Sequence, residues 1–87
     1  MKQINFYGNK NIISKQLKAA RENKKLSQSD LAAKLQTLNV NINQQMISKI
    51  EKNMRQATDY EVAAICKCLD ITFEWTISDY NNLIGIL

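Results

Sequence analysis

Apolar residues at helical spacing run through most of this chain, and few residues would interrupt a helix. Ile13, Leu17 and Ala20 stand at i, i+4 and i+7, and apolar residues repeat at similar spacing between positions 62 and 69. The sequence has no proline and only two glycines, so it contains few helix breakers. We therefore predict an all-α protein of short helices joined by tight turns.

The length sets the domain organisation. The 87 residues have room for one small core, which predicts a single domain over residues 1–87. No run of roughly 18 apolar residues is present to cross a bilayer. The first ten residues lack the apolar centre of a signal peptide. We expect a cytoplasmic protein with no membrane association.

Capping residues divide the chain into five predicted helices. The first covers about residues 11–23. Ser27 begins the second, and Asp30 three residues on completes a capping box. Thr58 and Glu61 form a second such box at the start of the fourth helix. The residues predicted to line the core side of the second helix are Leu31, Ala32, Leu35 and Leu38.

The other helix ends are also marked by polar residues. Asn43 is the predicted N-cap of the third helix, and Asn53 can close that helix in the left-handed conformation. Asp70 is predicted to end the fourth helix, and Thr72 to cap the fifth. Residues 77–87 then form an unusually apolar C-terminal extension.

The third predicted helix, NQQMISKIE at residues 43–51, has one apolar face and one polar face. Ile47 and Ile50 stand three apart and share the face that would meet a core. The outward side chains are Gln44, Gln45, Ser48 and Lys49. A glutamine amide matches the adenine N6/N7 edge, and lysine suits guanine or a phosphate. The alternative is an ordinary solvated face of an amphipathic helix.

Charge is divided unevenly along the chain. Residues 1–55 hold eleven of the twelve Lys and Arg against three acids, a net charge of +8. Residues 56–87 hold one lysine against five acids, a net charge of −4. The basic part contains the glutamine helix, which favours a phosphate-binding surface over charge that serves only solubility.

The two cysteines do not indicate a metal or redox site. Cys66 and Cys68 stand two apart on a predicted helix, so they lie on different faces and cannot pair with each other. Cys66 is predicted to be a core residue. With no histidine, a zinc site would lack ligands. The sequence has no nucleophile and base at a recognisable spacing and no glycine-rich phosphate loop. Nothing therefore indicates an enzyme, and we expect no cofactor.

Several motifs follow one another along the chain. They are Ile13 and Leu17 as IxxxL, Arg21 seven residues before Gln28, LSQxDLA at residues 26–32, ISKIE at 47–51, and DYEVAAICKCLDITFEW at 59–75. Together they resemble the Cro/C1-type (lambda repressor-like, XRE) helix-turn-helix family over residues 13–76. The resemblance implies a five-helix bundle with the helix-turn-helix at its second and third helices, and binding to double-stranded DNA.

The resemblance also implies roles for individual residues. Gln28 would anchor a phosphate, Gln44, Gln45 and Lys49 would read base edges, and Met46 would touch a thymine methyl. Ser48, Lys52 and Arg55 would contact phosphates, and Arg55 suits this role best because its guanidinium can grip an anion in two places. The alternative is that Arg55 is merely exposed. The predicted DNA-binding residues are thus Gln28, Asn43, Gln44, Gln45, Met46, Ser48, Lys49, Lys52 and Arg55. Arg21 and Glu51 would form a partly buried structural ion pair.

One segment departs from the family pattern. Fourteen residues separate Ala32 from Ile47, which makes the turn about five residues longer than in the compact family motif. The second helix is therefore predicted to continue through Leu38 before Asn39 or Asn41 turns the chain. The longer turn leaves the angle of the third helix open.

The apolar C-terminus predicts a homodimer. The candidate interface residues are Trp75, Tyr80, Leu83, Ile84 and Leu87. A two-fold dimer would set two reading helices about 34 Å apart, as a repressor on a pseudopalindromic operator requires. Alternatively the C-terminus folds back on its own chain, or holds a protein partner as an antitoxin or phage adaptor would. Residues 1–10 form an N-terminal arm, which could lie on DNA or as a strap over the fifth helix.

Overall fold

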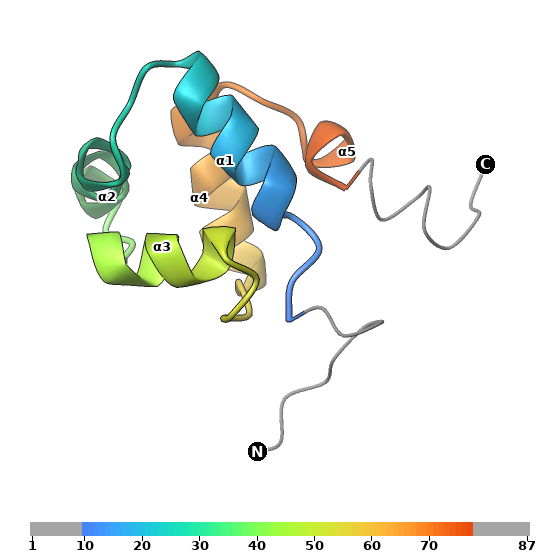
Figure 1. Cartoon of the computed structure of the whole chain (residues 1–87). Helices are drawn as coiled ribbons and strands as arrows, with labels where there is room; N and C mark the ends of the chain where they lie inside the picture. Colours follow the sequence, from blue (N-terminus) through green and yellow to red (C-terminus); the bar gives the residue numbers. More distant parts are fainter. Residues whose placement is uncertain (1–9, 78–87) are drawn as a thin grey trace, which may run out of the picture.

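The computed structural model describes residues 10–77, and these residues form five α-helices. The helices are α1 (Ser14–Asn23), α2 (Gln28–Thr37), α3 (Gln44–Glu51), α4 (Asp59–Leu69) and α5 (Phe73–Thr76), as Figure 1 shows. The predicted all-α fold is confirmed. No helix within residues 10–77 has both the length and the apolar character needed to span a bilayer.

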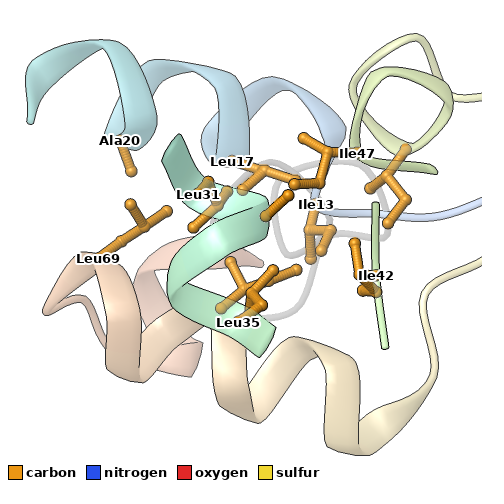
Figure 2. Packing of buried hydrophobic residues seen from close by; sticks show 11 residues of the cluster. Ile13, Leu17, Ala20, Leu31, Leu35, Ile42, Ile47 and Leu69 are labelled. Atoms are coloured by element: carbon orange, nitrogen blue, oxygen red, sulfur yellow. The ribbon is translucent and has the colours of Figure 1, made fainter. Parts of the chain in front are cut away.

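A single apolar cluster holds the four longer helices together. Its buried members are Ile13, Leu17, Ala20, Leu31, Ala32, Leu35, Ile42, Ile47, Ile50, Ile65 and Leu69. Figure 2 shows their side chains converging from separate elements. The helical spacing in α1 predicted its buried face correctly, because Ile13, Leu17 and Ala20 are all at most 5% exposed. The same cluster fixes α3 through Ile47 and Ile50.

The predicted N-caps are present. The Ser27 hydroxyl accepts a hydrogen bond from the Asp30 backbone N–H at 2.9 Å, and the Asp30 carboxylate accepts one from the Ser27 N–H at 2.9 Å. Thr58 and Glu61 form the corresponding box at α4. The Asn43 side chain accepts from the Met46 N–H at 2.9 Å and so starts α3.

Left-handed residues end three of the helices or follow them closely. Asn39, Asn53 and Asp70 have φ values of 62°, 60° and 55°. Asparagine and aspartate adopt this conformation more readily than other residues with a side chain. The sequence predicted it for Asn53, and it predicted a helix end at Asp70 and a turn at Asn39 or Asn41. Lys25, with φ of 57° after α1, was not predicted to do so.

The long turn between α2 and α3 differs from its prediction. Helix α2 ends at Thr37, and Leu38 is 37% exposed, so the assignment of Leu38 to the core was wrong. Ile42 is fully buried instead. The added residues thus carry an apolar side chain back to the core. Cys66, predicted as core, is only partly buried.

Candidate nucleic-acid interface

The polar face of α3 is open to solvent beside α2. Gln44 and Gln45 are exposed in its first turn, and Lys49 is exposed one turn later. The opposite face is anchored because Ile47 and Ile50 are fully buried. Figure 1 shows α3 along one side of the bundle with α2 next to its N-terminal part. The fold therefore presents the end of α3 that carries both glutamines.

Hydrogen bonds connect the first turn of α3 to its last residue through Gln28. The Gln44 Nε2 donates to Gln28 Oε1 at 2.6 Å, and the Gln28 Nε2 donates to Glu51 Oε1 at 3.0 Å. An ionised carboxylate can only accept hydrogen bonds, so the Gln28 side chain must turn its NH₂ group toward Glu51. Gln28 then offers its oxygen to Gln44. This chain of bonds sets the direction in which each amide points.

Glu51, the last acceptor in this series of hydrogen bonds, is held in place by Arg21. The Arg21 Nε lies 2.7 Å from Glu51 Oε2, and its Nη2 lies 3.1 Å from Oε1. A third guanidinium nitrogen, Nη1, donates to the Leu26 carbonyl at 2.7 Å. The side chains of Arg21 and Glu51 are 10% and 3% exposed, and their hydrogen bond raises the pKa of Arg21. The structure thus brings together the two residues expected to pair.

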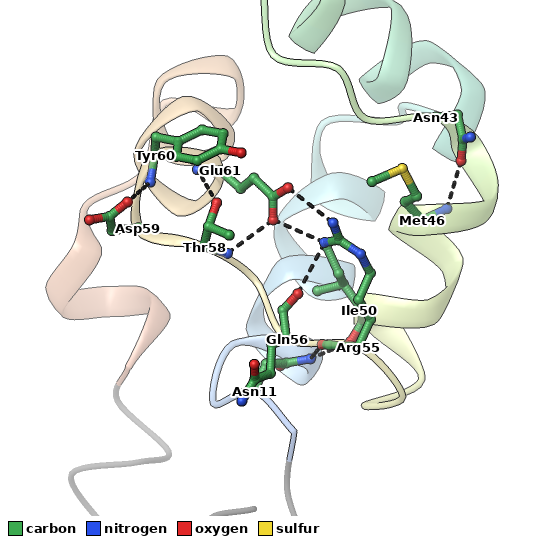
Figure 3. A network of polar contacts seen from close by, with 10 residues as sticks. All are labelled: Asn11, Asn43, Met46, Ile50, Arg55, Gln56, Thr58, Asp59, Tyr60 and Glu61. Carbon is green, nitrogen blue, oxygen red and sulfur yellow. Dashed lines mark hydrogen bonds and ion pairs between the residues drawn. The ribbon is translucent and has the colours of Figure 1, made fainter. Parts of the chain in front are cut away.

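Arg55 makes a second ion pair, which the sequence did not indicate. Its Nη1 and Nη2 lie 2.9 Å and 3.1 Å from the two carboxylate oxygens of Glu61 (Figure 3). Arg55 was expected to grip a phosphate with both terminal nitrogens, and in the structure these nitrogens grip the Glu61 carboxylate. The Arg55 side chain is 24% exposed and that of Glu61 is 5% exposed. The only sequence signal near Glu61 was its capping box with Thr58.

The surroundings of Glu61 favour its ionised form. Burial alone would raise its pKa, but hydrogen bonds from Arg55 and from the Thr58 N–H more than offset burial. The pKa of Glu61 is consequently lowered from its ordinary value of 4.5. The carboxylate thus joins the α3–α4 loop to the start of α4.

Two asparagines attach the chain before α1 to the end of α3. The Asn53 Oδ1 accepts from the backbone N–H groups of Lys10 and Asn11, at 2.8 Å and 3.1 Å. The Asn11 Nδ2 donates to the carbonyls of Ile50 and Arg55, both at 2.9 Å (Figure 3). Sequence spacing could not identify these contacts, because they join residues about 40 positions apart.

The remaining predicted residues occupy different environments. Met46 and Ser48 are partly buried, and Met46 packs against the core cluster. Lys52 is exposed just after α3, and Asn43 is exposed while its side chain caps the helix. Trp75, on α5, is 41% exposed, whereas the other dimer candidates lie outside residues 10–77. Within those residues, no three His, Cys, Asp or Glu side chains gather to hold a metal.

A family model described as helix-turn-helix matches residues 17–76, which include α2, α3 and α4 entirely. No curated protein and no solved structure matched the chain. The match covers more than half of the 87 residues, and the five helices agree with it. The chain therefore belongs to the Cro/C1-type (XRE) helix-turn-helix family, a family of DNA-binding regulators and not of enzymes.

Proposed function

We propose that this chain is a sequence-specific transcriptional repressor that binds a pseudopalindromic operator in double-stranded DNA as a homodimer, in the cytoplasm. The observation that carries the proposal is the exposed N-terminal turn of α3, where Gln44 is oriented by Gln28 and Glu51. A side chain held in one direction before binding loses less conformational entropy when it meets a base.

Base reading is assigned to the exposed face of α3. Gln44 directs one N–H at Gln28, so its oxygen and its second N–H are available to a base edge. These groups match the N6 donor and N7 acceptor of adenine. Gln45 and Lys49 would reach neighbouring base pairs, with Lys49 suited to guanine. Met46, which is partly buried, would offer its apolar edge to a thymine methyl.

Phosphate binding is assigned to the ends of α2 and α3. Gln28 begins α2, where free backbone N–H groups and the helix dipole favour an anion. Ser48, Lys52 and Asn43 would flank the reading face. Both terminal nitrogens of Arg55 already bond to Glu61, so the two-pronged grip of the guanidinium is used within the chain, and only its remaining N–H groups could reach a phosphate. We therefore propose that Arg55 mainly supports the loop that carries Lys52.

The dimer is assigned to α5 and the residues after it. Phe73 and Trp75 are 53% and 41% exposed on α5, so they leave apolar surface for a second copy to cover. Tyr80, Leu83, Ile84 and Leu87 would extend that surface. A two-fold pair would place the reading helices about 34 Å apart, one turn of DNA.

Selection from random duplexes, followed by fluorescence anisotropy on the selected DNA, tests this function. We expect a two-fold motif, and a weakening of about a hundredfold in the double variant Gln44→Ala/Gln45→Ala, since each lost base contact contributes about 1–3 kcal/mol. Lys67→Ala, in the acidic part of the chain (residues 56–87), is the control variant and should bind as the parent does. Failure to enrich any motif would reject the proposal.

A protein-interaction module is the second candidate, and the exposed Phe73 and Trp75 favour it. An antitoxin or phage adaptor would use this apolar surface, and the glutamines of α3 would not matter. Such an interface should respond little to salt, whereas DNA binding through several phosphates weakens steeply. Binding to a partner that survives Gln44→Ala/Gln45→Ala would therefore favour the module.

A further inference from the structure

A second surface, away from the polar face of α3, contains an apolar groove of about 680 Å³. It lies between the chain leading into α1, the α3–α4 loop, α4 and the start of α5. The groove is lined mainly by apolar side chains, including those of Ile12, Ala57, Val62, Ala63 and Phe73. Cys66 also lines it. None of the residues assigned above to DNA binding lines the groove, and of the residues assigned to the dimer only Phe73 does. The proposed function therefore leaves most of the groove unexplained.

The chain that precedes α1 forms one wall of this groove. Lys10, Asn11, Ile12 and Ile13 all contribute to the lining. The backbone of Lys10 and Asn11 is fixed there by the Asn53 side chain. Residues 1–9 therefore join the described chain at the groove itself. Any apolar side chain just before Lys10 starts beside an apolar surface.

The N-terminal residues include such side chains. Ile4, Phe6 and Tyr7 stand three to six residues before Lys10. Even a fully extended chain keeps Phe6 within about 14 Å of Lys10. So short a connection gives a high effective concentration at the groove.

The C-terminal residues are less well connected to the same surface. Only Phe73 of α5 lines the groove, and Ile77 does not. Tyr80, the first large apolar residue beyond Ile77, stands seven positions after Phe73. These connections favour the N-terminal segment as the occupant.

We propose that Ile4 to Tyr7 dock into this groove of their own chain as a strap that covers Cys66. Docking would bury apolar side chains of the strap and of the groove, and this burial would stabilise the docked state. It would also reinforce the attachment of Lys10 and Asn11 to Asn53. The end of α3 is held by the same attachment, so the strap would help to fix the reading helix.

The two natural cysteines give a direct test with an internal control. Cys66 lines the groove, whereas Cys68 does not, although both are partly buried on α4. The full chain and an Ile4→Ser/Phe6→Ser/Tyr7→Ser variant are labelled with a thiol reagent, and each cysteine is followed by residue-resolved mass spectrometry. Loss of the strap should speed labelling of Cys66 by about fivefold or more and leave Cys68 unchanged. Equal acceleration of both cysteines would show a general loosening of the fold and would count against a strap over Cys66.

Three results would overturn the proposal. One is an unchanged ratio of Cys66 to Cys68 labelling in the variant. Another is protection of Cys66 that depends on protein concentration, which would assign the groove to a second copy. The third is loss of protection in Leu83→Ser/Ile84→Ser, with the N-terminal variant behaving as the parent, which would assign it to the C-terminal segment.

Discussion

Glu51 accepts hydrogen bonds from Arg21 and Gln28, so a buried charge and a surface amide depend on one carboxylate. Glu51→Ala should lower the free energy of unfolding by about 3 kcal/mol, because Arg21 would be left buried without its partner. Urea denaturation measures this loss. Glu22→Ala removes an exposed acid from α1 and should have little effect. An unchanged denaturation midpoint in Glu51→Ala would contradict the structural role.

Glu61 makes stability depend on pH. Its pKa is lowered in the folded chain, so its contribution is fully present above the ordinary value of 4.5 and is lost as pH falls through the folded value. Urea denaturation should therefore show the free energy of unfolding decreasing below about pH 4.5. Glu61→Gln should lose less stability over the same pH range. Glu74→Gln, which removes one exposed carboxylate, controls for net charge.

For single residues, the sequence predicted the contacts that join positions close along the chain and those that belong to a family motif. The boxes of Ser27 with Asp30 and of Thr58 with Glu61 follow from side chains three residues apart. The hydrogen bonds that Gln44 donates to Gln28 and the Lys10 N–H donates to Asn53 join distant positions. They could not be predicted, because they require helix placement.

At the scale of elements, the long turn between α2 and α3 is stabilised by one buried side chain. Ile42→Ala should lower the free energy of unfolding by about 3 kcal/mol, because it leaves a cavity in the core. Leu38→Ala is the matched control in the same turn. Since Leu38 is 37% exposed, that variant should lose less than about 1 kcal/mol. Equal losses in urea denaturation would show that the turn is not anchored through Ile42.

Helix α3 has only eight residues, so its N-cap should matter both for stability and for DNA binding. Asn43→Ala should lower the free energy of unfolding by about 1 kcal/mol. Asn43→Asp keeps a capping oxygen and suits the helix dipole, so its stability should match the parent. Its added negative charge should nevertheless weaken DNA binding in anisotropy measurements. Parental affinity in Asn43→Asp would place Asn43 away from the phosphates.

At the scale of the whole molecule, net charge of +8 in residues 1–55 predicts strongly salt-dependent DNA binding. Affinity should fall by orders of magnitude between about 50 and about 200 mM salt. Lys52→Ala, if it removes one phosphate contact, should reduce the slope of log affinity against log salt by about 1. Lys67→Ala should leave the slope as in the parent. A slope near zero in the parent would indicate that phosphates contribute little.

By itself, the sequence determined the five helices, the N-caps of α2 to α5 and most of the buried apolar residues of α1 to α4, because periodicity and capping act within a few residues. The tertiary structure decided what the helix ends contact. Ile42 replaces Leu38 in the core, Arg55 pairs with Glu61, and Asn53 holds the chain before α1. These outcomes depend on the packing of separate helices, which brings together side chains that no local spacing relates.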